Sequence, residues 1–106
     1  MSTPNKKHDP CAHQIEQLLK ARYVAQHRKA KVKAYRYNSA SIRVRIINPD
    51  FAGQTIPERE NAVWSILDTL PEDVRSEITV LLLVTPEESK TSLMSMEFDH
   101  PTSSKL

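Results

Sequence analysis

The sequence predicts a small α+β domain with two layers, a three-stranded sheet and helices on one of its faces, in the order α-β-β-α-α-β. Apolar residues at helical spacing occupy residues 15–23. Two neighbouring segments, 31–37 and 41–47, alternate with period two, and a continuous apolar run covers 78–84 after a second helical stretch. The 106 residues, of which 39% are hydrophobic and 26% charged, suit one domain with one core.

The first helix is predicted over residues 10–26. Asp9 can cap its N-terminus, and Pro10 is tolerated at the first helical position. Ile15, Leu18, Leu19 and Tyr23 then share one face. Residues 1–9 lack such a pattern and are predicted to form a flexible N-terminal tail.

A β-hairpin is predicted from strands 31–37 and 41–48, joined by Asn38-Ser39-Ala40. A two-residue loop would set Lys31 and Lys33 beside the isoleucines of the second strand, because a slip of one residue inverts a strand. We prefer the three-residue loop, which keeps these lysines out of the core and places one arginine on the core face near the turn. It puts Val32, Ala34 and Arg36 with Ile42, Val44 and Ile46 on one face, and Lys31, Lys33, Tyr35, Tyr37, Arg43 and Arg45 on the other.

The second half of the chain begins with Gly53, the only glycine, which indicates a positive φ. Thr55 and Glu58 fit a capping box for a helix over 56–69. A helical turn at 71–76 and a strand at 78–85 follow, so that the predicted domain covers 10–88. Residues 89–106 show little periodicity and are predicted to form a disordered C-terminal tail.

The charge is distributed unevenly along the chain. Residues 1–45 carry eleven lysines and arginines against two carboxylates, a net charge of +9. Residues 46–106 carry four against eleven, a net charge of −7. Such asymmetry favours an anionic partner for the basic half, unless the two halves neutralise one another in the fold.

Several short motifs resemble the second half of BolA-like proteins. They are Phe51 with Gly53, Glu58-Arg59, Val63-Trp64-Ser65 with Leu67, and an apolar strand that ends in Thr85-Pro86-Glu87-Glu88. The resemblance implies a fold akin to the type II KH domain. It also implies a regulatory or adaptor role through protein interaction, in that family with monothiol glutaredoxins through a shared iron–sulfur cluster.

The chain departs from the family where the cluster would be bound. The family's Arg-His-Arg corresponds to Arg59-Glu60-Asn61, and the histidine that helps to ligate the cluster corresponds to Thr79. The loop that supplies another ligand is cut to residues 38–40. Because threonine is not a ligand for such clusters, we predict that the protein holds no cofactor. The GxxG loop of RNA-binding KH domains is absent as well.

Catalytic and metal-binding patterns are sparse. His8, Cys11 and His13 are zinc-ligand types at compact spacing, but a closed site needs a fourth ligand, and a frayed helix start is the more common place for such residues. Cys11 lacks the His-plus-acid constellation of a catalytic thiol. The sequence carries no Walker loop, GxSxG or HExxH motif. We therefore predict no metal site and no enzymatic activity, and interpret Trp64 as core-edge packing rather than a ligand platform.

The basic face of the hairpin is the one candidate binding site. Cations and aromatic rings together suit single-stranded nucleic acid, and the six residues are Lys31, Lys33, Tyr35, Tyr37, Arg43 and Arg45. The alternatives are a solvated strand face or a surface docked by the acidic tail.

The leading hypothesis is a BolA-like adaptor with an unknown protein partner, and the alternative is a nucleic-acid-binding module. No apolar run approaches the length of a membrane span, and there is one cysteine. A cytoplasmic protein, monomeric or weakly dimeric, is therefore expected.

Overall fold

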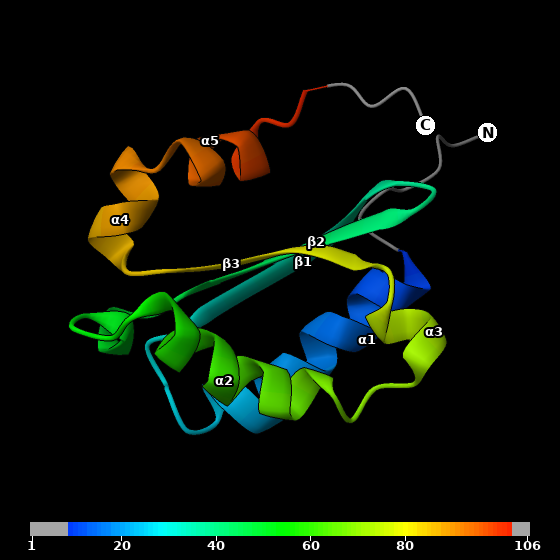
Figure 1. Cartoon of the computed structure of the whole chain (residues 1–106), viewed down its shortest axis with the longest axis horizontal. Helices are drawn as coiled ribbons and strands as arrows, with labels where there is room; N and C mark the ends of the chain where they lie inside the picture. Colours follow the sequence, from blue (N-terminus) through cyan, green and yellow to red (C-terminus); the bar gives the residue numbers. More distant parts are fainter. Residues whose placement is uncertain (1–8, 103–106) are drawn as a thin grey trace.

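A three-stranded sheet forms the centre of the molecule, and helices lie on both of its faces (Figure 1). The computed structural model describes residues 9–102. Strands β1 (Lys31–Asn38), β2 (Ser41–Ile47) and β3 (Ile78–Val84) lie in the order β1-β2-β3, with β1 antiparallel and β3 parallel to β2. The predicted α+β class with a three-stranded sheet is confirmed. The prediction that helices lie on one face only is wrong, because the C-terminal helices cover the other face.

The layer below the sheet in Figure 1 contains the helical elements that precede β3. They are α1 (Pro10–Leu19), the π-helical turn η2 (Lys20–Val24), α2 (Ile56–Leu67) and α3 (Glu72–Arg75). A 3-10 turn, η3 (Pro49–Phe51), leads from β2 towards α2. Their apolar faces and the facing side of the sheet form one core, whose fully buried members include Ile15, Leu19, Ile42, Val44, Ile46, Phe51, Val63 and Leu67. Trp64 packs partly buried against this core, as predicted.

The hairpin has the register predicted from the three-residue loop. Val32 pairs with Ile46, Ala34 with Val44 and Arg36 with Ile42. The ladder shifts between Arg36 and Asn38, so that Asn38 pairs with Ser41 and a bulge precedes the turn. Because the register beyond the bulge is kept, the lysines stay out of the core.

The first helix begins as predicted but does not continue as one α-helix to residue 26. Asp9 caps it, with its Oδ2 accepting from the N–H of Ala12 at 3.0 Å. From Lys20 the chain continues as η2, which ends at Val24. This wider turn buries Tyr23, whose hydroxyl accepts a hydrogen bond from Asn48 Nδ2 at 2.9 Å. The buried Asn48 thus ties the first helical segment to the end of β2.

The elements of the second half match the prediction closely. Gly53 has φ +81°, and Thr55 and Glu58 form the predicted capping box at the start of α2. Helix α2 ends two residues earlier and β3 one residue earlier than predicted, which is the usual uncertainty of element ends. None of the helices within residues 9–102 is long and apolar enough to cross a membrane.

Residues 89–102 do not form the predicted disordered tail. The chain continues after β3 into α4 (Pro86–Thr91) and α5 (Leu93–Asp99), which lie across the face of the sheet opposite to α1 and α2 (Figure 1). Sequence signals for both helices exist: Thr85 and Glu88 form a second capping box, and Ser92 caps α5. The predicted tails at residues 1–8 and 103–106 lie outside the described residues.

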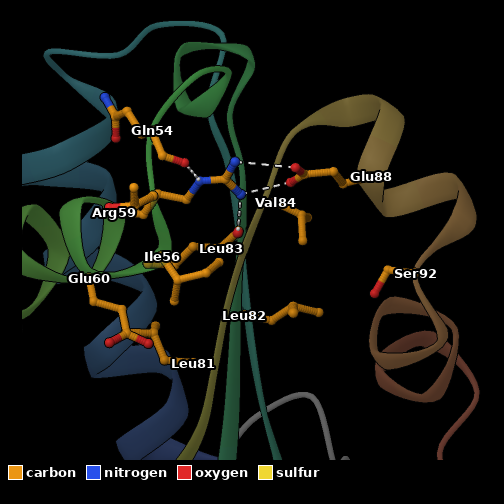
Figure 2. A pocket seen from close by; sticks show the side chains of 11 residues that line it. Gln54, Ile56, Arg59, Glu60, Leu81, Leu82, Leu83, Val84, Glu88 and Ser92 are labelled. Carbon is orange, nitrogen blue, oxygen red and sulfur yellow. Dashed lines mark hydrogen bonds and ion pairs between the residues drawn. The ribbon is translucent and has the colours of Figure 1, made fainter.

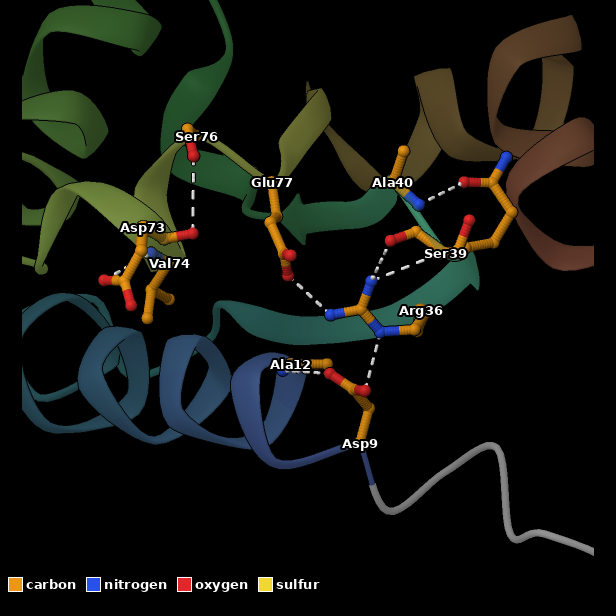
Figure 3. Close-up of polar contacts among 10 residues, drawn as sticks. Asp9, Ala12, Arg36, Ser39, Ala40, Asp73, Val74, Ser76 and Glu77 are labelled. Carbon is orange, nitrogen blue, oxygen red and sulfur yellow. Dashed lines mark hydrogen bonds and ion pairs between the residues drawn. The ribbon is translucent and has the colours of Figure 1, made fainter. Parts of the chain in front are cut away.

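Arg36, the arginine predicted on the core face, is neutralised by two carboxylates (Figure 3). Its Nε lies 2.6 Å from Asp9 Oδ1, its Nη2 lies 2.5 Å from Glu77 Oε1, and its Nη1 donates to the carbonyl of Asn38. Burial raises the pKa of Asp9, but the hydrogen bonds from Arg36 and from the N–H of Ala12 outweigh it and leave that pKa below its usual value. One guanidinium therefore joins the start of α1, the hairpin turn and the segment that leads into β3.

Candidate functional site

The predicted basic residues do share one face of the sheet, but α5 covers much of it. We call Lys31, Lys33, Tyr35, Tyr37, Arg43 and Arg45 the basic strand face. Lys31 and Lys33 are exposed, whereas Arg45 is only 8% exposed. Of the alternatives considered from the sequence, docking of the acidic C-terminal segment is the arrangement that the structure has.

Ion pairs hold α5 against this face. Arg43 Nη1 lies 3.1 Å from Glu97 Oε2, and Arg45 Nη1 lies 3.0 Å from Asp99 Oδ2. Arg45 also donates to Ser95 Oγ at 2.9 Å. The two carboxylates that flank Phe98 in sequence are thus each paired with one arginine of β2.

Aromatic contacts fill the space between these pairs. The ring of buried Phe98 meets Tyr35 edge to face, with centroids 4.8 Å apart, and lies 4.5 Å below the guanidinium of Arg45. Tyr35 donates its hydroxyl to the carbonyl of Phe98 at 2.7 Å, and Tyr37 donates to that of Thr102 at 2.6 Å. The face thus holds the Glu97-Phe98-Asp99 segment through charge, aromatic contact and main-chain hydrogen bonds together.

The docked carboxylates have lowered pKa values. The N–H of Thr102, and next the guanidinium of Arg43, hold the pKa of Glu97 below its ordinary value of 4.5. The hydrogen bond from Arg45 lowers the pKa of Asp99 below 3.8, against the opposing effect of burial, and Lys33 and His100 add to the lowering. Both carboxylates are therefore charged at neutral pH while α5 is docked.

Acid is expected to release α5 before it unfolds the core. The pKa values of Glu97 and Asp99 are lower in the docked state than in the free segment. The two carboxylates therefore stabilise docking fully above their ordinary pKa values, and this stabilisation is lost as the pH falls below about 4, through the pKa values of the docked state. Ring signals of Phe98 in NMR spectra, followed from pH 7 downwards, should change in this range while Trp64 keeps its native environment. Release near pH 6, or retention of the docked signals after both carboxylates are protonated, would contradict this expectation.

The second candidate surface is the free edge of β3. The carbonyl of Val84 accepts from the N–H of Asn48, whereas that of Leu83 accepts from Arg59 Nη1 on the other side of the strand, at 3.0 Å. Main-chain groups of successive residues in a parallel ladder point to opposite sides. Those of Leu81 therefore point away from β2, and within residues 9–102 no strand lies beyond β3.

The opposite edge of the sheet is protected. The N–H of Ala34 points away from β2 and donates to Glu16 Oε2 of α1 at 2.9 Å. The side chain of Lys20 lies 3.6 Å from the same carboxylate. A charged side chain thus occupies the position where another strand would pair with β1.

An open groove of about 570 Å³ runs along the free edge of β3, between α2 and α4 (Figure 2). Ile56 and Leu81 lie on the α2 side of the strand, and Leu82 and Ser92 on the other side. Ile56 is 57% exposed although it is a large apolar side chain. An unpaired strand edge, an exposed isoleucine and the half-buried Leu81 and Leu82 therefore occur together.

Arg59 closes the upper end of this groove in Figure 2. It is 5% exposed, donates to the carbonyls of Gln54 and Leu83, and makes two hydrogen bonds with the carboxylate of Glu88, at 2.7 and 3.2 Å. These bonds from Arg59, and next the N–H of Thr85, lower the pKa of Glu88. The one cation that lines the groove is therefore already neutralised.

The candidate metal ligands do not come together in the described part of the chain. Cys11 packs partly buried against the core, His13 is exposed, and His8 lies outside the described residues. Within residues 9–102, no three His, Cys, Asp or Glu side chains gather where they could hold a metal ion. Thr79 is exposed on β3. The absence of a cofactor remains a prediction.

The groove was not predicted from the sequence. The run from Ile78 to Val84 predicts a strand covered on both faces, and α2 and α4 do lie on either side of it, but strand order is not readable from that run. Comparison of the chain with family models, with curated proteins and with solved structures gives no match.

Proposed function

We propose that the protein is a non-enzymatic protein-binding module that receives an extended segment of a partner protein as a fourth strand beside β3. The observation that carries this proposal is the free edge of β3 within an open apolar groove. The main-chain groups of Leu81 would pair with those of the segment. Ile56 and Leu82, on opposite sides of the strand, would contact its alternate side chains.

The groove also indicates the chemistry of that segment. Its wall is apolar around Ile56, Leu81 and Leu82, and it contains the carboxylate of Glu60, which forms no ion pair within residues 9–102. A segment with apolar side chains at alternate positions and a lysine or arginine beside Glu60 complements it. A small molecule fits less well, because such sites enclose the ligand and converge several polar groups on it.

The resemblance to BolA-like proteins supports an adaptor role through protein interaction. In that family the interaction with glutaredoxins uses a shared cluster, and the present chain has Thr79 where the ligand histidine is expected. Recognition through the strand edge requires no cluster. We therefore place the partner at β3 rather than at a metal centre.

Peptides of about ten residues, selected from a random displayed library on the full-length chain, test this proposal. Selected peptides should carry alternating apolar residues and shift the amide signal of Leu81. Ile56→Glu should weaken their binding about 10-fold or more, because the exposed isoleucine becomes buried in the complex. Leu93→Glu is the matched control, since Leu93 is 80% exposed and does not line the groove.

Two results would overturn the proposal. One is selected peptides whose binding is equally unaffected by Ile56→Glu and Leu93→Glu. The other is association of the chain with itself through β3 in sedimentation experiments, in preference to any peptide, which would assign the edge to a second copy.

A further inference from the structure

The basic strand face is occupied by a segment that combines two carboxylates with an aromatic ring. Glu97, Phe98 and Asp99 place an anion, a ring and an anion against Arg43, Tyr35 and Arg45. Single-stranded nucleic acid presents the same combination, with phosphates that pair with cations and bases that stack on aromatic rings. The docked segment therefore shows that this face binds anionic groups and an aromatic ring at the same time.

We propose that the basic strand face is a binding site for single-stranded nucleic acid, which α5 occupies in the free protein and vacates when the nucleic acid binds. This function is separate from the proposed peptide site, because the face and the groove share no residue.

The cations that α5 leaves uncovered favour this ligand over an acidic peptide. Lys31 and Lys33 are exposed on the same face and pair with no carboxylate within residues 9–102, although Lys33 is close enough to Asp99 to lower its pKa. A polyanion gains contacts with both lysines that α5 does not make. An acidic peptide would instead compete with the Glu97-Phe98-Asp99 segment, which offers the same groups and has a high effective concentration because it belongs to the same chain.

Helix α5 makes few buried contacts with the basic strand face, so that a ligand can displace it. The helix has seven residues, and only Ser95 and Phe98 among them are buried. The carboxylates of Glu97 and Asp99 are 34% and 41% exposed, so that solvent partly screens both ion pairs although the two arginines are largely covered. Docking lowers the apparent affinity for nucleic acid by the fraction of molecules in which the face is open. Loosening α5 should therefore increase the affinity.

The test compares two full-length variants that lose the same charge. The first, Glu97→Gln with Phe98→Ser and Asp99→Asn, removes the contacts of α5. The second, Asp73→Asn with Glu87→Gln, removes two exposed carboxylates elsewhere. Labelled oligonucleotides of about ten nucleotides, one of deoxythymidine and one of uridine, are titrated at several salt concentrations. The first variant should bind at least about 10-fold more tightly than the second.

The contacts are then located in the first variant. Adding Lys31→Ala and Lys33→Ala should reduce the log–log salt slope by about 1.4, because each phosphate contact contributes about 0.7. Adding Lys20→Ala and Arg22→Ala, in η2 on the other side of the sheet, should leave the slope unchanged. Tyr35→Ala should weaken binding about 5-fold or more with little change of slope.

The natural chain provides a measurement that does not depend on the folding of any variant. A saturating oligonucleotide should shift the amide signals of β1 and β2 and at the same time raise the hydrogen-exchange rates of α5. Equal affinities of the two charge-matched variants, or oligonucleotide binding with α5 still protected, would overturn the proposal. The proposal would also be overturned if the first variant bound a Glu-Phe-Asp peptide more tightly than the second variant but bound neither oligonucleotide more tightly. That result would assign the face to acidic peptides. The relative affinities of the two oligonucleotides identify the preferred nucleic acid.

Discussion

Arg59→Met is expected to lower the free energy of unfolding by about 3 kcal/mol, because it removes four hydrogen bonds and leaves the buried carbonyl of Leu83 without this donor. The carbonyls of Gln54 and Leu83 lose their donor, and Glu88 loses its two charge-assisted hydrogen bonds. Urea denaturation measures the loss. Hydrogen exchange in α4 should also become faster, since Arg59 links that helix to α2 and β3.

The matched control for this variant is Arg22→Met. Arg22 is exposed in η2, so the same change of side chain should alter the free energy of unfolding by less than about 0.5 kcal/mol. If Arg59→Met costs no more than Arg22→Met, the hydrogen bonds of Arg59 do not hold the end of the groove together.

Arg36→Leu is expected to destabilise the fold by about 2–3 kcal/mol, somewhat less than a fully buried broken ion pair, because these pairs are only partly buried. The side chain of Arg36 is 23% exposed, and its loss leaves the carboxylates of Asp9 and Glu77 close together without this cation. Urea denaturation in buffers of low and high salt measures the effect, which should be smaller at high salt.

Neutral partners provide the control for Arg36. The triple variant Asp9→Asn, Arg36→Leu and Glu77→Gln removes all three charges, and asparagine can still cap α1. It should recover about 1 kcal/mol or more of the loss, because the unpaired carboxylates are the main cost. A triple variant that is less stable than Arg36→Leu alone would show that packing of the arginine stem, rather than charge, dominates.

Local signals in the sequence were sufficient for most of the fold. These signals depend on residues that are close in sequence. They are the helix caps at Asp9 and Thr55, the positive φ of Gly53 and the alternation of the two hairpin strands. The hairpin register followed from keeping Lys31 and Lys33 out of the core. The π-helical turn η2 was not predicted, and the hydrogen bond that its Tyr23 accepts comes from Asn48, which is distant in sequence.

The candidate sites depend on contacts between distant residues, and the sequence revealed them only in part. The pattern of the hairpin placed six residues on the basic strand face correctly. It did not show that Phe98 packs against Tyr35. In this seven-residue helix the other apolar side chains, Leu93, Met94 and Met96, are exposed, so that the buried face leaves hardly any periodic signal. The groove beside β3 could not be predicted either, since it requires knowing which strand lies at the edge.

The unequal edges of the sheet limit how copies of this protein can associate. Growth of a fibre by strand pairing requires two open edges on every molecule, so that each copy both gives and receives a strand. Here Glu16 occupies the β1 edge at Ala34, and among residues 9–102 nothing pairs with the β3 edge. When two molecules pair through β3, the open edge of each is hydrogen-bonded to that of the other. Self-association of the folded chain through its sheet therefore stops at a closed pair.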